Sequence, residues 1–352
     1  MNLRLLLCAF LVSVLQLAPA YATPKSVTLG ILTDLSGPAA YWGNQTRIGT
    51  EIALEEINQG DSPSLKVVFS DHQLNTAKAV TGAQKLIHID SVDALYSEFT
   101  PTSIAASPIA NKAKKLFTYA AAAQSILDDN PQAFKSYLNY IAGCRAIAQF
   151  WKDKGIEKIG ILKATAEFGE LCLKGAESVY PEMTIVDYNH GENVATQVLL
   201  LKQKGVQAVL NATFEPDLLR MLKNMKTLKY SPLIGSNEDA LGTEAAKQYP
   251  QLAKGVSLFG FAHISDTFTE KVKQRDPNNT LVSLEAAALA YLHIKQLYQT
   301  ILACGADSQC QQRTFAQSAP NGVIAFQGWS NRVAQFDVSL KEWSGDRFEV
   351  QS

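Results

Sequence analysis

The sequence has no excess of basic residues. Its 32 lysines and arginines are balanced by 33 aspartates and glutamates. A protein that binds nucleic acid needs a basic surface to neutralise phosphates, so the balance indicates that nucleic acid is not a partner. Charged residues make up only 18% of the chain and hydrophobic residues 47%, which is typical of a globular protein and not of a disordered one.

The sequence also lacks the short motifs of common enzyme classes. It has no GxSxG, GxGxxG, HExxH or Walker loop. Its five histidines are scattered, and none stands at a useful spacing from a cysteine, a serine or a second histidine. Gly60-Asp61-Ser62 resembles a nucleophile turn, but it follows a helical pattern and precedes Pro63, as a helix-ending turn does. We therefore expect a binding protein and not an enzyme, with no cofactor and no metal.

Long hydrophobic runs are absent after the first residues. Met1–Arg4 carries a positive charge, Leu5–Leu17 is almost wholly apolar, and Ala20-Tyr21-Ala22 has the pattern of a signal-peptidase site. The run is shorter than the roughly 20 residues of a membrane span, and Cys8 lies too far from the cleavage site for a lipoprotein anchor. We expect a signal peptide over residues 1–22 and a mature net charge of about −2, since the net charge of −1 includes Arg4.

Four cysteines remain in the mature chain: Cys144, Cys172, Cys304 and Cys310. Cys304 and Cys310 bracket a short loop and are predicted to form a disulfide. Cys144 and Cys172 would then either pair or stay free. No CxxC motif occurs and no histidine stands at ligand spacing from these cysteines, so a metal site is not indicated.

Apolar segments of strand length alternate with helical patterns along the mature chain. The first set has strands at 27–33, 65–70, 92–97 and 115–119 and helices at 44–58, 76–89 and 101–114. The second set has strands at 158–163, 184–188, 208–211, 232–235 and 256–261 and helices at 144–154, 168–179, 195–204 and 216–228. A long helix at 281–302 and a tail of short strands and turns over 322–343 follow. This alternation predicts an α/β fold with parallel sheets, in two lobes joined by a stiff hinge.

In such sheets, ligands bind beyond the carboxyl ends of the strands, where helix N-termini offer unpaired N–H groups. The corresponding loops are residues 34–43, 98–103, 120–125, 164–169, 212–216 and 236–239. The first of them, DLSGPAAYWG, ends in two large aromatic residues where a connecting loop is usually small and polar.

The segment VTLGILTDLSGPAAYWGNQTRIGTEIALEEIN resembles the opening of periplasmic solute-binding proteins of the leucine/isoleucine/valine-binding type. The similarity continues, in order, through YSEFTPTSIAASPIANKAKK, ILKATAEFGELCLKGAE, TFEPDLLRMLKNMK and LIGSN. The resemblance implies the type I periplasmic binding fold: two doubly wound Rossmann-like lobes joined by a three-strand hinge. Lobe 1 would comprise residues 23–142 plus 261–331, and lobe 2 residues 143–260 plus 332–352. It also implies a monomeric periplasmic receptor that delivers an amino acid, or a related carboxylate or amide, to the permease subunits of an ABC importer.

The resemblance assigns ligand contacts in both lobes. Trp42 matches an aromatic residue of the first lobe that walls the ligand, and Phe168 matches one of the second lobe that closes over it. Thr100 matches a hydroxyl-bearing residue that holds a carboxylate. Ala121 and Ala123 match positions that supply backbone groups, although many relatives have a hydroxyl where Ala123 stands.

Further contacts are implied in the second lobe. Phe214 and Glu215 match a tyrosine-bearing loop. Asn237 or Glu238 matches the acid that takes a ligand ammonium, with the register open by one residue.

Glu98 departs from the family pattern, because its place is usually small or apolar. A buried carboxylate needs a partner, so we expect Glu98 to pair with a lysine or to bind a cationic part of the ligand.

Two other functions stay open at this stage. The same bilobed protein could present its ligand to a membrane signalling protein as a sensory receptor. An enzyme on a similar fold is the third alternative, and turnover of the bound ligand would identify it.

Overall fold

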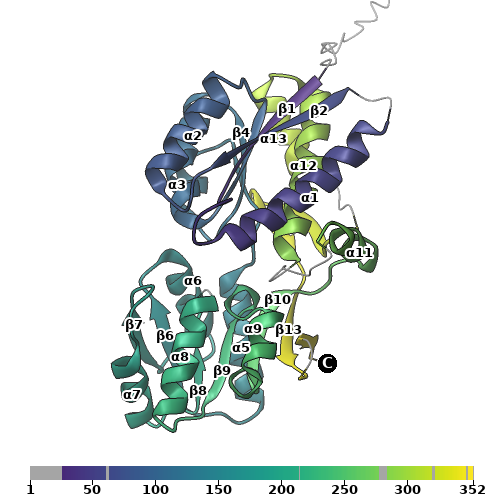
Figure 1. Cartoon of the computed structure of the whole chain (residues 1–352). Helices are drawn as coiled ribbons and strands as arrows, with labels where there is room; N and C mark the ends of the chain where they lie inside the picture. Colours follow the sequence, from purple (N-terminus) through teal and green to yellow (C-terminus); the bar gives the residue numbers. More distant parts are fainter. Residues whose placement is uncertain are drawn as a thin grey trace, which may run out of the picture.

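The computed structural model describes residues 26–60, 63–213, 215–276, 284–318, 322–345 and 348–351. They form two lobes, each built on a seven-stranded sheet with helices on both faces (Figure 1). The expected signal peptide, residues 1–22, lies outside the described residues. None of the described helices is both long and apolar enough to cross a membrane. The two-lobed α/β fold expected from the sequence is confirmed.

The first sheet has the strand order β11-β12-β5-β4-β3-β1-β2. Its strands are β1 (Ser26–Thr33), β2 (Ser64–Asp71), β3 (Ala94–Glu98), β4 (Leu116–Ala120), β5 (Ala133–Lys135), β11 (Phe326–Ser330) and β12 (Val333–Phe336). All neighbours pair in parallel except β11 and β12. Its helices are α1 (Ala40–Asn58), α2 (Thr76–His88), α3 (Thr100–Lys112), α4 (Ser125–Asp129), α11 (Asp266–Arg275), α12 (Glu285–Cys304) and α13 (Ser308–Ala316).

The second sheet has the strand order β14-β13-β10-β9-β8-β6-β7. Its strands are β6 (Ile159–Ala164), β7 (Thr184–Tyr188), β8 (Ala208–Leu210), β9 (Leu233–Asn237), β10 (Val256–Phe261), β13 (Val338–Trp343) and β14 (Phe348–Val350). Its helices are α5 (Tyr140–Asp153), α6 (Glu167–Glu177), α7 (Ala195–Gln203), α8 (Glu215–Thr227), the 3-10 helix η1 (Glu238–Ala240), α9 (Thr243–Gln248) and α10 (Pro250–Ala253). β13 and β14 form the antiparallel edge of an otherwise parallel sheet.

The chain passes between the lobes three times: at residues 136–139 after β5, at residues 262–265 after β10, and at Asp337 between β12 and β13. The last two crossovers lie side by side, because the Ala262 N–H donates to the Asp337 carbonyl at 2.9 Å. The sequence placed the third boundary before residue 332, since alternation continues through β12 and β13 without a break. β12 nevertheless pairs with β5 and β11 of the first sheet, so the third crossover comes after it.

Helix α1 begins at Ala40, four residues before the expected start at Asn44. The Asp34 carboxylate organises the turn before it, accepting hydrogen bonds from the N–H groups of Gly37 at 2.5 Å and Ala39 at 2.9 Å. The helix then passes directly over the Asp34 backbone: a Cβ on Gly43 would lie only 1.8 Å from the Asp34 carbonyl oxygen. Trp42 is therefore part of the first helical turn and not of a loop.

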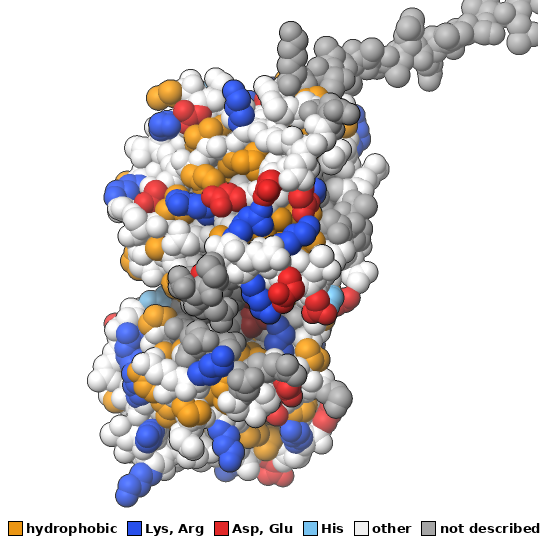
Figure 2. Space-filling view, turned by 45° about the vertical axis from the view of Figure 1, so that its right-hand side comes forward, with side chains coloured by type: hydrophobic (Ala, Val, Ile, Leu, Met, Phe, Trp, Pro, Cys, Tyr) orange, Lys and Arg blue, Asp and Glu red, His pale blue; other side chains and the backbone are white. Residues whose placement is uncertain are grey.

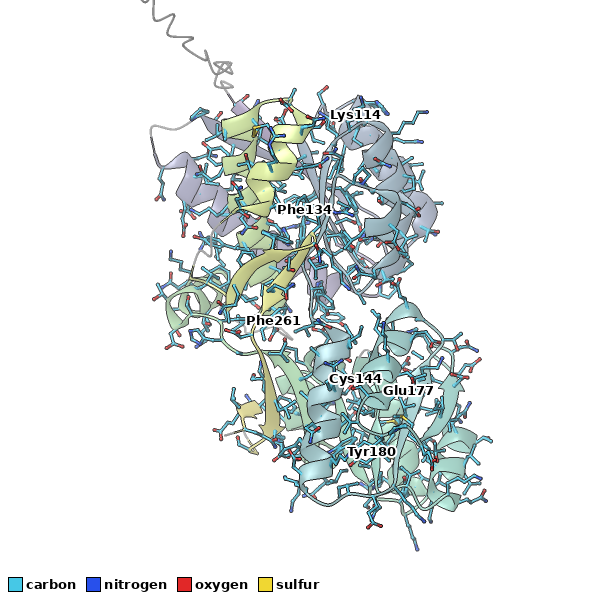
Figure 3. The ribbon with its side chains drawn as sticks, turned by 180° about the vertical axis from the view of Figure 1, so that it is seen from behind. Lys114, Phe134, Cys144, Glu177, Tyr180 and Phe261 are labelled. Carbon is cyan, nitrogen blue, oxygen red and sulfur yellow. A yellow bond between two sulfur atoms is a disulfide. The ribbon has the colours of Figure 1, made fainter. Side chains whose placement is uncertain are left out.

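Both cysteine pairs are disulfide-bonded. Cys304 at the end of α12 is linked to Cys310 in α13, as expected. Cys144 and Cys172, which the sequence left open, are linked between α5 and α6 (Figure 3). On the face shown in Figure 2, acidic and basic side chains are interspersed over both lobes, without a field of one sign.

Candidate functional site

A hollow of about 450 Å³, including its open mouth, lies between the two lobes. It is lined by Tyr41, Trp42, Phe99, Thr100, Ala120, Ala121, Ala122, Tyr137, Tyr140, Phe168 and Asp239. The first lobe supplies the residues up to Ala122, the first crossover supplies Tyr137, and the second lobe supplies the rest. Six of these side chains are aromatic and one is a carboxylate.

Trp42 is hydrogen-bonded to Glu98, a fully buried residue at the end of β3. The Glu98 carboxylate accepts hydrogen bonds from the hydroxyls of Thr33 and Thr46, from the Tyr96 hydroxyl at 3.0 Å, and from the Trp42 side chain. Burial raises the pKa of Glu98 to about 7, although these donors oppose the rise. The partners of Glu98 are thus hydroxyls and the Trp42 side chain, and not the lysine that was one of the two expected partners. Glu98 does not line the hollow, where the other, a cationic part of the ligand, would lie.

The start of α3 forms another part of the wall. Phe99 has a φ of 66°, which is unusual for a residue with a side chain and costs on the order of 1–3 kcal/mol. Its N–H donates to the Ala120 carbonyl at 3.3 Å, which joins this turn to the alanines after β4. Thr100 faces the hollow, whereas the Thr102 hydroxyl donates back to the Glu98 carbonyl at 2.7 Å.

The alanines after β4 line the hollow only in part. Ala120, Ala121 and Ala122 reach it, but Ala123 is fully buried and does not. The Ala123 carbonyl instead accepts a hydrogen bond from the Tyr119 hydroxyl at 2.8 Å. Behind this wall, the buried Lys135 ammonium donates to the Ala122 carbonyl at 2.5 Å.

A row of aromatic rings runs from one lobe to the other. The ring centroids of Trp42 and Tyr137 are 6.5 Å apart, those of Tyr137 and Tyr140 are 6.2 Å apart, and those of Tyr140 and Phe168 are 5.9 Å apart. All four side chains are less than 10% exposed. Trp42 and Phe168 lie at the two ends of this row, and Tyr137 and Tyr140 lie between them.

Asn237 and Glu238, the two candidates for the acid, both point away from the hollow. Asn237 accepts from the Thr213 N–H at 2.9 Å and donates to its carbonyl at 3.0 Å. Glu238 accepts from the Phe261 N–H at 3.0 Å and from the Lys341 ammonium at 2.6 Å. Burial, with Glu285 nearby, raises the pKa of Glu238 to about 8, although Lys341 opposes the rise.

The next residue, Asp239, supplies the carboxylate of the hollow. It is 5% exposed. Its Oδ2 accepts a hydrogen bond from the Tyr137 hydroxyl, whereas the buried Oδ1 has no hydrogen-bond partner among the described residues. Burial and the nearby Glu285 raise the pKa of Asp239 well above its usual range, and Lys341 opposes the rise. A desolvated oxygen without a partner is costly, so Asp239 is suited to accept a hydrogen bond from a ligand.

Glu167, at the start of α6, joins the two lobes beside the hollow. Its Oε1 accepts from the Gln124 N–H at 2.6 Å and from the Ser125 N–H at 3.3 Å, and its Oε2 lies 3.3 Å from the Ser125 hydroxyl. Gln124 and Ser125 belong to the first lobe, so this contact stabilises the arrangement of the lobes seen here.

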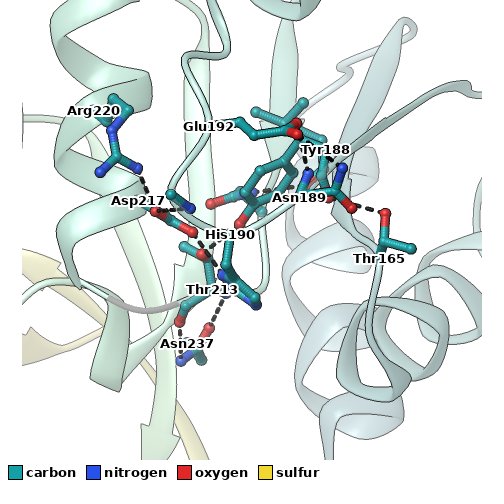
Figure 4. A network of polar contacts seen from close by, with 12 residues as sticks. Thr165, Tyr188, Asn189, His190, Glu192, Thr213, Asp217, Arg220 and Asn237 are labelled. Atoms are coloured by element: carbon teal, nitrogen blue, oxygen red, sulfur yellow. Dashed lines mark hydrogen bonds and ion pairs between the residues drawn. The ribbon is translucent and has the colours of Figure 1, made fainter. Parts of the chain in front are cut away.

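A polar network in the second lobe includes His190, Asp217 and Arg220 (Figure 4). The Phe168 ring centroid lies 5.4 Å from that of His190, and His190 Nδ1 is 2.6 Å from Asp217 Oδ2. Asp217 Oδ1 also accepts from Arg220 and from the Gly191 N–H. Burial alone would raise the pKa of Asp217, but these partners hold it below its usual value.

Residues 26–308 match the sequence model of a protein family, which is described as periplasmic binding protein. The chain belongs to the periplasmic binding protein family. The hollow of this periplasmic binding protein lies where the carboxyl ends of the strands in both lobes face each other, as expected for doubly wound sheets.

Curated relatives carry the name Leu/Ile/Val-binding protein homolog 7. That of Brucella suis is 27% identical over 236 residues, covering 61% of this chain and 59% of the relative. That of Brucella abortus is 26% identical over 246 residues, covering 64% and 61%. This periplasmic binding protein therefore spans about three fifths of the length of the curated relatives it matches.

Solved structures resemble the fold over nearly the whole chain. A leucine-binding protein from Thermotoga maritima has a TM-score of 0.82 at 15% identity, covering 93% of this chain and 98% of that one. A branched-chain amino acid transporter substrate-binding protein from Streptococcus pneumoniae, solved with isoleucine, has a TM-score of 0.80 at 16% identity, covering 92% and 98%. At these identities, the likeness shows the fold alone.

The structure brings together four of the residues expected at the ligand site: Trp42, Thr100, Ala121 and Phe168. Ala123, Glu98, Asn237 and Glu238 lie outside the lining. Phe214 and the side chain of Glu215 lie outside the described residues.

Sequence reasoning missed several lining residues. Tyr137 stands in the first crossover and Tyr140 begins α5, in a stretch that the sequence assigned to no element. Asp239 lay within an expected loop, one residue beyond the two candidates. Its signal was the run of two acids after β9, which left the register unresolved.

Proposed function

We propose that this periplasmic binding protein captures a small ligand between its lobes and delivers it to an ABC importer. The proposed ligand is an amino acid or a related compound that carries an ammonium group. The observation that supports this most directly is Asp239 Oδ1. Within the described part of the chain, this buried oxygen has no hydrogen-bond partner, and it belongs to a hollow lined by aromatic rings from both lobes. A ligand ammonium would give this oxygen a charge-assisted hydrogen bond.

The aromatic walls suit the remainder of such a ligand. Burying apolar ligand surface against Trp42 and Phe168 contributes about 25 cal/mol per Å². Because one ring comes from each lobe, a ligand that touches both favours the closed arrangement over an open one. Thr100 adds a hydroxyl at the start of α3. The names of the relatives are consistent with this ligand class.

Native mass spectrometry of protein purified from the periplasm without refolding tests capture directly. We expect a small-molecule adduct that disappears on denaturation. A panel of amino acids, amines and organic acids should then include a compound that stabilises the protein by about 2.7 kcal/mol at 100 times its dissociation constant. If there is no adduct and no compound of the panel raises the melting temperature, the receptor proposal is wrong.

Delivery to an importer is tested separately. Deleting the gene for this protein should abolish cellular uptake of the identified ligand, measured with the radiolabelled compound. Unchanged uptake, together with a lost transcriptional or chemotactic response, would favour the sensory alternative. Conversion of the ligand by the pure protein would favour an enzyme.

A further inference from the structure

The side chains around the hollow are unequally suited to the two charges of a zwitterion. Among the described residues that line it, no lysine, arginine or histidine occurs, and Thr100 is the only one besides the tyrosines with a side-chain hydroxyl. Ala120, Ala121 and Ala122 stand where hydroxyl-bearing side chains could have donated. An anionic ligand group would thus lose its hydrogen bonds to water and find few side-chain donors to replace them, which is costly.

The start of α3 offers little more to an anion. Pro101, at the second position of this helix, has no N–H group, so one of the amides that helix N-termini usually present is missing. The Thr102 hydroxyl is bonded to the Glu98 carbonyl at 2.7 Å, and the Ser103 hydroxyl lies 2.9 Å from that of Ser97. These hydroxyls face into the lobe and not into the hollow.

The opposite side of the hollow has Asp239 in its lining and two further carboxyl groups close to Asp239. Three carboxylates gather there: Glu238, Asp239 and Glu285, all less than 10% exposed. Lys341 is the cation beside them, 2.6 Å from Glu238 and 4.0 Å from Glu285. Glu285 Oε2 and Asp239 Oδ1 are both buried without a hydrogen-bond partner in the described ranges. Burial raises the pKa of Glu238 and Asp239. A positive ligand group beside them would favour their ionised forms, so this side is suited to a positive ligand group.

The row of aromatic rings also favours a positive ligand group. Ring faces attract cations, by about 0.5–2 kcal/mol for each good contact. Trp42, Tyr137, Tyr140 and Phe168 form a continuous row that passes the Tyr137–Asp239 hydrogen bond. Aromatic faces beside a buried carboxylate can bind substituted ammonium groups that have few N–H donors, or none.

We propose that this hollow selects an organic cation, an amine or quaternary ammonium compound with an apolar body, and that it does not require a carboxylate on the ligand. This inference rests on the proposed receptor function and narrows its ligand class. The ammonium lies between Asp239 and the aromatic row, and the apolar body fills the space towards Ala121. A ligand carboxylate is an added cost here and not an anchor.

The test compares three versions of one carbon skeleton by titration calorimetry and thermal shift on the wild-type protein. They are phenylalanine, 2-phenylethylamine and 3-phenylpropionate, with the leucine, 3-methylbutylamine and 4-methylpentanoate series beside them and benzyltrimethylammonium as the quaternary probe. We expect at least one cation without a carboxylate to bind at least as tightly as its amino acid, and the carboxylates without an ammonium not to bind.

Two variants connect the preference to the site. Asp239→Asn should weaken the cation by about 30-fold or more, because it removes the buried charge partner. Asp187→Asn is the matched control, since Asp187 is 63% exposed and pairs with Lys163 outside the hollow, and it should leave affinity unchanged. If Asp239→Asn fails to fold, Trp42→Leu tests the aromatic part and should weaken the cation by about tenfold.

The outcomes separate the two proposals. An amino acid that binds tenfold more tightly than its amine, or a carboxylate that binds while the amine does not, overturns the cation assignment and leaves the receptor function intact. Failure of every cation to bind also overturns it. A cation whose affinity is the same in the wild type, Asp239→Asn and Trp42→Leu binds elsewhere, and this overturns it as well. The receptor function itself fails only if the wider panel and native mass spectrometry detect no ligand.

Discussion

Replacing Glu98 by glutamine should remove one defined part of the stability that the wild-type protein loses between mild acid and pH 8.5. Glu98 is fully buried, and burial raises its pKa to about 7, against an ordinary value of 4.5. Between these two values, the folded protein keeps a proton that the unfolded chain has released. Stability therefore falls as the pH rises from about 4.5 through 7, and the loss is complete above about pH 8.

The size of the effect follows from the two pKa values. The full difference corresponds to about 3 kcal/mol. Between pH 5.0 and 8.5, the wild-type protein should lose about 2.5 kcal/mol of unfolding free energy from this group. Glutamine has no proton to release, and its amide can donate to a neighbouring threonine hydroxyl, which can turn to accept. Glu98→Gln should therefore lack this part of the pH dependence.

Denaturant unfolding at pH 5.0, 6.0, 7.0 and 8.5 measures the effect. Other titrating groups contribute equally to both proteins, so the difference between variant and wild type isolates Glu98. Glu51→Gln, an exposed position on α1, is the matched control and should follow the wild-type curve. Parallel curves for the wild type and Glu98→Gln would refute the reasoning, since they would show that Glu98 is ionised throughout.

Three further outcomes are expected. Trp42→Ala should weaken ligand binding in calorimetry by about 1–3 kcal/mol, and it should also lower stability, because the side chain is buried and bonded to Glu98; unchanged affinity would remove Trp42 from the site. Glu167→Gln should weaken the contact between the lobes, lowering ligand affinity by about 1 kcal/mol and increasing the radius of gyration in X-ray scattering; an unchanged radius and affinity would contradict this. Changing Cys144 and Cys172 together to alanine should lower the free energy of unfolding by about 3–4 kcal/mol, because the disulfide closes a loop over a sequence separation of 28. An unchanged melting temperature would contradict that expectation.

The sequence predicted strands β1 to β4 and β6 to β10 because strands buried on both faces are short apolar runs that contrast with the helices between them. It assigned no element to β5, which is only three residues long. It placed the start of α1 too late because Gly43 stands in the first turn. Glycine usually marks the end of a helix. Here it is present because the helix passes so close to Asp34 that a side chain would not fit. That contact joins residues of a turn and a helix, and periodicity does not report it.

The site was only partly predictable for the same reason. Trp42 and Phe168 could be found because each stands shortly after a strand, in the first turn of the helix that follows it. Asp239 could not be separated from Glu238, because two neighbouring acids give one sequence signal and only the fold decides which one Lys341 pairs with. Tyr137 was missed because it belongs to a crossover, where neither helical nor strand periodicity operates.

The position of Tyr137 has a mechanical consequence. It belongs to a segment that connects the lobes, its hydroxyl is bonded to Asp239 of the second lobe, and its ring neighbours Trp42 of the first. A segment that connects the lobes is thus also part of the wall of the hollow. If the lobes rotate apart about this crossover, the hydrogen bond between Tyr137 and Asp239 has to break, so the movement that opens the hollow also takes its wall apart.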